Sequence, residues 1–113
     1  MLLVLKGIDD PVSRVRCRAT TGKNGDSVDV STYEMAFYES PDVRIPNVNI
    51  SRTSEALIFV KNLCRYVREK HLLEGEVVFF GPTCLKAVLD KKNYQKQNHY
   101  GVFVLVPVND TEC

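Results

Sequence analysis

Basic and aromatic residues gather in one stretch near the C-terminal end of the sequence, DKKNYQKQNHY, over residues 90–100. Its only acidic residue is the first, and its candidate ligand-binding side chains are Lys91, Lys92, Tyr94 and Lys96. Lysines neutralise phosphates, and a tyrosine ring can stack on any base. The combination is typical of proteins that bind single strands of nucleic acid without sequence preference. The alternative is a solvated surface loop that binds nothing.

A second basic pattern lies in VSRVRCRAT, residues 12–20, where Arg14, Arg16 and Arg18 alternate with apolar residues. Alternation with period two predicts a half-buried strand, with the three arginines on one face at a spacing of ~6.6 Å. That spacing is near the phosphate repeat of an extended single strand, although a solvated sheet face is an equally ordinary explanation. The Asn-Gly dipeptide that follows predicts a hairpin, and Lys23 at its tip is a further phosphate-binding candidate.

Catalytic and metal-binding motifs are absent from the sequence. The four cysteines, Cys17, Cys64, Cys84 and Cys113, form no CxxC pair, and the two histidines do not have zinc-finger spacing. We therefore expect Cys17, Cys64 and Cys84 to be buried free thiols in a reducing compartment, with no metal and no cofactor. We also expect no enzymatic activity. The alternative, a cysteine- or metal-dependent enzyme, would lose its activity on Cys84→Ser substitution.

The elements that would position these residues form a single domain over residues 1–113, mainly β with one helix. Strands are expected at 2–6, at 12–20 and 27–39 as a hairpin, at 76–80 and at 101–108, and residues 83–89 are either strand or short helix. Residues 42–50 contain Pro46, which predicts an edge strand or two pieces around a bulge. Apolar residues at i, i+3, i+4 and i+7 predict a helix over about 53–72. The sheet is expected to be a small barrel or strongly bent and antiparallel.

Composition agrees with a soluble protein that has localised charge. Of the 113 residues 44% are hydrophobic and 26% charged, and the formal net charge is +1. No apolar run is long enough to cross a membrane, and MLLVLKGIDD lacks the basic start of a signal peptide. We expect a cytoplasmic protein whose basic patches bind phosphate with modest, salt-dependent affinity.

Two blocks resemble the single-stranded DNA-binding proteins of filamentous bacteriophages (gene V type, helix-destabilising). One is residues 12–50, with a basic strand, a glycine-containing hairpin, the aromatic segment MAFYE and a strand with an internal proline; the other contains GEVVFFGPTCLK and ends in LVPV. The resemblance implies an OB-like fold, a homodimer and a replication role in the host cytoplasm. It implies that Arg16, Arg18 and Lys23 bind phosphates, that Phe37 and Tyr94 stack on bases, and that Lys86 lies near the DNA groove.

The sequence therefore favours a non-catalytic, sequence-tolerant protein that binds single-stranded DNA. The runner-up is a small phage-type protein that binds a host protein and inhibits or redirects it. In that case the exposed faces of the helix and of the segment Tyr33–Tyr38 would form the interface.

Overall fold

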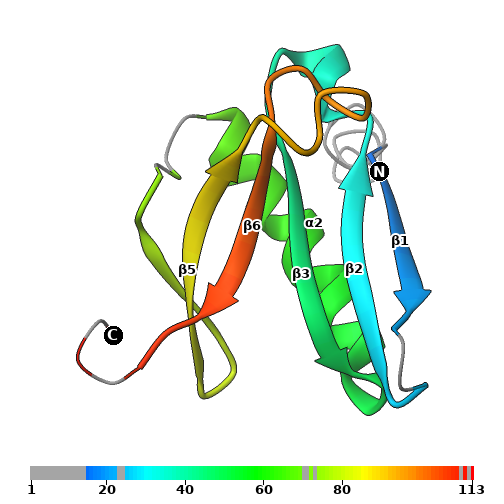
Figure 1. Cartoon of the computed structure of the whole chain (residues 1–113), viewed down its shortest axis with the longest axis vertical. Helices are drawn as coiled ribbons and strands as arrows, with labels where there is room; N and C mark the ends of the chain where they lie inside the picture. Colours follow the sequence, from blue (N-terminus) through cyan, green and yellow to red (C-terminus); the bar gives the residue numbers. More distant parts are fainter. Residues whose placement is uncertain (1–14, 23–24, 70–71, 73, 110, 112) are drawn as a thin grey trace, which may run out of the picture.

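The computed structural model describes residues 15–22, 25–69, 72, 74–109, 111 and 113. Within these ranges the chain forms six strands, two short 3-10 helices and one α-helix (Figure 1). The elements are β1 (Arg16–Thr21), β2 (Ser27–Tyr33), η2 (Met35–Tyr38), β3 (Asp42–Asn49), η3 (Ile50–Arg52), α2 (Thr53–Arg68), β4 (Val77–Phe80), β5 (Thr83–Asp90) and β6 (Val102–Pro107).

All six strands belong to one sheet, in the order β1-β2-β3-β6-β5-β4. The prediction of a mainly β domain with one helix is confirmed. The sheet is strongly bent but open, so it is not a closed barrel, and β1 and β4 are its edges. It is also mixed rather than purely antiparallel, because β3 and β6 run parallel where Asp42–Arg44 faces Val102–Val104.

The hairpin of β1 and β2 confirms the period-two pattern. Arg16 pairs with Tyr33 and Arg18 with Ser31, and both arginines are exposed, whereas Cys17 and Ala19 pack against the core. The strand predicted to reach Glu39 ends earlier, at Tyr33. Glu34 adopts the left-handed conformation, with φ of 78°, and turns the chain into η2. The expected strand at 2–6, Arg14 and Lys23 lie outside the described residues.

β3 is a central strand, so the prediction that it lies at an edge is wrong. It pairs with β2 on one side and with β6 on the other. The predicted bulge is present, because Pro46 and Asn47 together face one residue of β2, Asp29. A proline fits here because the ladder to β6 has already ended at Arg44, and a bulge needs no regular N–H partner.

The helix α2 begins where the periodicity predicted and ends four residues earlier, at Arg68 rather than about 72. Its buried face consists of Ala56, Val60, Leu63, Cys64 and Val67. This face packs across β1, β2 and β3, against valines such as Val30 and Val43. Among the described elements no helix packs across the opposite face of the sheet, which we call the open face (Figure 1). Among the described helices none has the length and apolar character needed to cross a membrane.

The prediction of free thiols at Cys17, Cys64 and Cys84 is confirmed for the first two and wrong for Cys84. Cys84, on β5, forms a disulfide with Cys113, while Cys17 and Cys64 are free. Burial raises the pKa of Cys64 to about 12, and it also raises that of Cys17. Both free thiols therefore stay protonated and behave as small apolar groups of the core. Cys84 in its disulfide is not a nucleophile.

Candidate nucleic-acid interface

The open face of the sheet has two halves of different character. The strand register places one set of side chains from β1, β2 and β3 together, which we call the polar half: Arg16, Arg18, Asp29, Tyr33 and Arg44. The same register continues across β6, β5 and β4 into an apolar half: Val77, Phe79, Val88, Val104 and Val106. Most predicted site residues that the structure describes belong to the polar half or adjoin it.

A cavity of about 530 Å³ opens at one end of the polar half. It is lined by Arg16, Tyr33, Glu34, Ala36, Phe37 and Gln97. Phe37 projects from η2 and is 81% exposed, which is far more than a core phenylalanine. A guanidinium and two aromatic rings therefore share one hollow that is large enough for an unstacked base with its sugar.

Both arginines of β1 already have partners on this surface. Arg16 Nε lies 2.8 Å from Glu34 Oε1, in an ion pair whose groups are both open to solvent. The Arg18 guanidinium carbon lies 5.4 Å from the centre of the Tyr33 ring, within the range of a cation–π contact. Exposed contacts of this kind are weak, so the arginines can exchange them for a phosphate.

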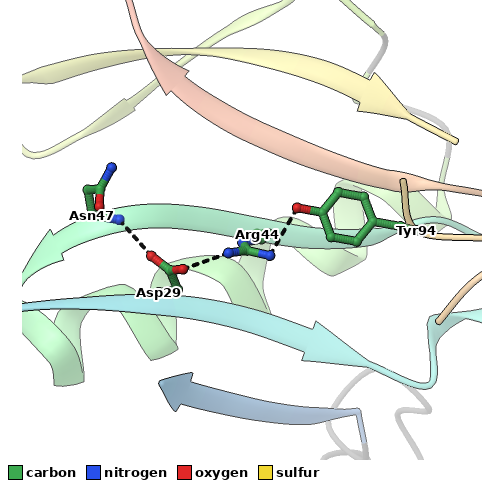
Figure 2. Close-up of polar contacts among 4 residues, drawn as sticks. All are labelled: Asp29, Arg44, Asn47 and Tyr94. Carbon is green, nitrogen blue, oxygen red and sulfur yellow. Dashed lines mark hydrogen bonds and ion pairs between the residues drawn. The ribbon is translucent and has the colours of Figure 1, made fainter. Parts of the chain in front are cut away.

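Arg44 lies on β3, where the polar half adjoins β6 of the apolar half (Figure 2). It donates to Asp29 Oδ2 at 2.6 Å and to the Tyr94 hydroxyl at 2.9 Å. The other Asp29 oxygen accepts from the Asn47 backbone N–H at 3.0 Å, so this carboxylate also holds the bulge of β3. Tyr94 is thereby fixed over the sheet, although it belongs to the loop 91–101.

A buried carboxylate, Asp42, ties the parts of the site together. One of its oxygens accepts from the Thr32 hydroxyl at 3.0 Å and from the Met35 backbone N–H at 3.2 Å. The other accepts from the Asn98 side-chain amide at 2.9 Å. Burial raises the pKa of Asp42, although these three hydrogen bonds oppose the shift. Asp42 thus holds three parts of the site in place: the end of β2, the 3-10 helix η2 that carries Phe37, and the loop that carries Tyr94.

The remaining predicted cations lie in two places. Lys91, Lys92 and Lys96 are exposed on the loop 91–101, at the same end of the sheet as η2 (Figure 1). The loop follows Asp90, the last residue of β5, whose pKa is lowered by hydrogen bonds from the Asn93 backbone and side-chain amides. Lys86 lies on β5 among the apolar half, three strands from β2, so it is not beside the cavity.

Sequence reasoning missed Arg44, Glu34 and Gln97, and it placed Tyr33 in the protein-binding alternative and not among the nucleic-acid-binding residues. Arg44 had a usable signal, because it alternates with Val43 and Ile45 in a strand. The contributions of Glu34 and Gln97 depend on a turn and a loop that meet only in the fold, and no local pattern indicates them.

Among the described residues, no group of three or more His, Cys, Asp or Glu side chains could hold a metal ion. No family model, curated protein or solved structure gives a significant match to the chain. The geometry of the open face is therefore the basis for a functional proposal.

Proposed function

We propose that the protein binds single-stranded DNA without sequence preference, on the polar half of its open sheet face. The observation that carries this proposal is the cavity in which Arg16, Tyr33 and Phe37 meet. Phosphate-binding cations beside exposed aromatic rings are the common feature of sequence-tolerant single-strand binding surfaces.

In the proposed complex the DNA backbone follows β1, with phosphates at Arg16 and Arg18. A base enters the cavity and stacks on Phe37, whose exposed ring costs little to cover with another aromatic surface. The exposed lysines of the loop 91–101 bind the adjoining phosphates. All of these contacts read charge and ring faces and none reads a base edge, so the binding tolerates any sequence.

The carboxylates on the same surface limit the affinity. Glu34 and Asp29 each neutralise one arginine before any ligand arrives. The protein as a whole carries a formal charge of only +1. Binding should therefore be moderate and should weaken steeply as salt concentration rises.

The test is the fluorescence anisotropy of labelled oligo-dT titrated with the protein at two salt concentrations. The expected result is saturation at a few nucleotides per protein and lower affinity at the higher salt. Lys91→Glu together with Lys92→Glu should weaken binding and flatten the salt dependence. Absence of binding at low salt would exclude the proposal.

The proposal extends to a replication role of the filamentous-phage type, in the host cytoplasm and as a homodimer. The resemblance in residues 12–50 and in the segment GEVVFFGPTCLK supports this extension. Sedimentation equilibrium tests the dimer independently of DNA. A monomer at micromolar concentration would remove that part of the proposal alone.

A second candidate function is the binding of a host protein, and the outer side of α2 supports it. Ile58 and Tyr66 lie about two turns apart there, with exposures of 63% and 54%. Large exposed apolar groups on one helix are a common feature of protein interfaces. If a host protein is the ligand, substitution of Ile58 and Tyr66 by serine should abolish its capture from lysate, whereas Lys91→Glu should not.

A further inference from the structure

Glu34 occupies the position at Arg16 that a phosphate would need. Its Oε1 atom lies 2.8 Å from Arg16 Nε on the wall of the cavity. A carboxylate and a phosphate offer the same kind of anionic oxygen to a guanidinium. A phosphate that binds the Nε side of the Arg16 guanidinium must displace this side chain.

The fold holds Glu34 in this position. Arg16 pairs with Tyr33 across the hairpin, so the residue after Tyr33 is beside Arg16 by register. The backbone of Glu34 is fixed in the left-handed region, and its carbonyl accepts from Phe37 N–H at 3.1 Å as η2 begins. The carboxylate is therefore tethered next to the guanidinium at a high effective concentration.

A tethered carboxylate discriminates between ligands by size. An isolated phosphate gains one contact at Arg16 and must bear the whole loss of its own freedom of movement. A chain of nucleotides is also bound at Arg18 and at the loop lysines. The phosphate of that chain next to Arg16 is therefore present at a high effective concentration, comparable with that of the Glu34 carboxylate.

We propose that Glu34 makes the site selective for nucleic-acid chains over mononucleotides and free phosphate, by occupying Arg16 until a multiply held chain displaces it. This inference rests on the proposed function and specifies its ligand class. Glu34 acts here as a positioning residue, through Arg16, and contacts no ligand itself.

The chain supplies a matched control for the test. Glu39 ends η2 as Glu34 begins it, and it also has a left-handed backbone, with φ of 55°. It has no ion-pair partner among the described residues. Glu34→Gln and Glu39→Gln remove the same charge from neighbouring turns, and only the first frees Arg16.

The experiment measures the affinity of the wild type and of both variants for two ligands. Binding of labelled oligo-dT of about 12 nucleotides is measured by anisotropy, and binding of dTMP by its competition with that oligonucleotide. Wild type should bind oligo-dT and leave dTMP unbound at millimolar concentration. Glu34→Gln should tighten oligo-dT binding by about fivefold and acquire measurable dTMP binding. Glu39→Gln should match the wild type for both probes.

A double variant tests the route through Arg16. In an Arg16→Gln background, Glu34→Gln should have no further effect on oligo-dT binding, because no guanidinium remains to be freed. Glu34→Asn, which tolerates the left-handed conformation, repeats the test if Glu34→Gln folds poorly.

The outcomes separate this inference from the proposed function. If wild type binds oligo-dT and the two glutamine variants behave alike, the role of Glu34 is excluded and the DNA-binding function stands. Wild-type binding of dTMP as tight as that of Glu34→Gln also excludes it. If neither the wild type nor any variant binds oligo-dT, the function itself fails, and the inference fails with it.

Discussion

The polar and apolar halves of the open face are built on one continuous sheet, yet they suit different ligands. In the polar half Arg16, Arg18 and Arg44 each have a carboxylate or a ring as partner. In the apolar half Phe79 and Val88 are 62% and 40% exposed. Charged groups with weak, exchangeable partners suit a solvated polyanion, whereas bare apolar side chains suit a protein surface. The surface proposed for a host protein, with Ile58 and Tyr66 on α2, is likewise separate from the polar half, so each candidate function can be disrupted alone.

The largest expected effect comes from Asp42→Ala, which removes the anchor of the polar half. The Thr32 hydroxyl, the Met35 N–H and the Asn98 amide would each lose a buried acceptor. We expect the free energy of unfolding to fall by about 3–5 kcal/mol, with loss of oligo-dT binding. Urea denaturation measures the change, and a loss below about 1 kcal/mol would contradict the anchoring role.

The same residue gives a pH dependence with a definite sign. Burial raises the pKa of Asp42, so the folded protein keeps this proton at pH values where the unfolded chain has lost it. This contribution makes stability fall as pH rises above about 3.9, the ordinary aspartate pKa, until the raised pKa is passed. Asp42→Ala should lack it, and urea midpoints of both proteins across this range measure the difference. The opposite slope would show that the hydrogen bonds outweigh burial.

Breaking the disulfide should affect the other half of the sheet. Cys84 and Cys113 are 29 residues apart in sequence, so their bond closes a loop around β5 and β6. Cys84→Ser should lower the free energy of unfolding by about 3 kcal/mol and leave oligo-dT affinity unchanged. Wild type under reducing conditions should match the variant, and Cys17→Ser, which removes only a free thiol, should lose as much stability on reduction as the wild type. Equal urea midpoints with and without reductant would contradict a stabilising bond.

Two exposed phenylalanines, one beside each half, give the sharpest functional contrast. Phe37→Ala should weaken oligo-dT binding by about 1–3 kcal/mol, the energy of one stacked base. Phe79→Ala should leave it unchanged. Neither should alter thermal stability much, because both rings are already exposed. Equal losses in the two variants would show that the polar half is not the DNA surface.

The smallest expected effect comes from Tyr94→Phe, which keeps the ring and removes the hydroxyl that accepts from Arg44. We expect about 0.5–1.5 kcal/mol less stability, together with a small change in DNA affinity. Tyr100→Phe, in the same loop, is the matched control. If both variants have the same melting temperature, the Arg44–Tyr94 bond contributes nothing.

The local elements could be predicted from the sequence because their causes are local. The Asn-Gly turn and the alternating arginines identify the hairpin of β1 and β2, and the apolar spacing identifies α2. The end of β2 was predicted wrongly, because Tyr33, Phe37 and Tyr38 all favour strands. The strand instead ends before Glu34, because the Met35 backbone N–H donates to the side chain of Asp42, which lies seven residues further along the chain.

The site itself was only partly predictable. Arg16, Phe37 and Tyr94 were expected, and the structure brings the first two into one cavity with the loop of the third beside it. The parallel contact of β3 with β6, the Cys84–Cys113 bond and the cross-sheet partners of Arg44 join residues far apart in sequence. Single-sequence patterns contain no information on such pairings.

The central place of β6 in the sheet has a consequence for how the protein is made. β6 follows every other described strand in the chain, yet it lies between β3 and β5. During synthesis the halves β1–β3 and β4–β5 emerge first, and the inner edge of each half has no strand partner among the described strands until Val102–Pro107 has left the ribosome. The loop that carries Tyr94 precedes β6 directly, so the binding surface is completed in the same step that joins the sheet.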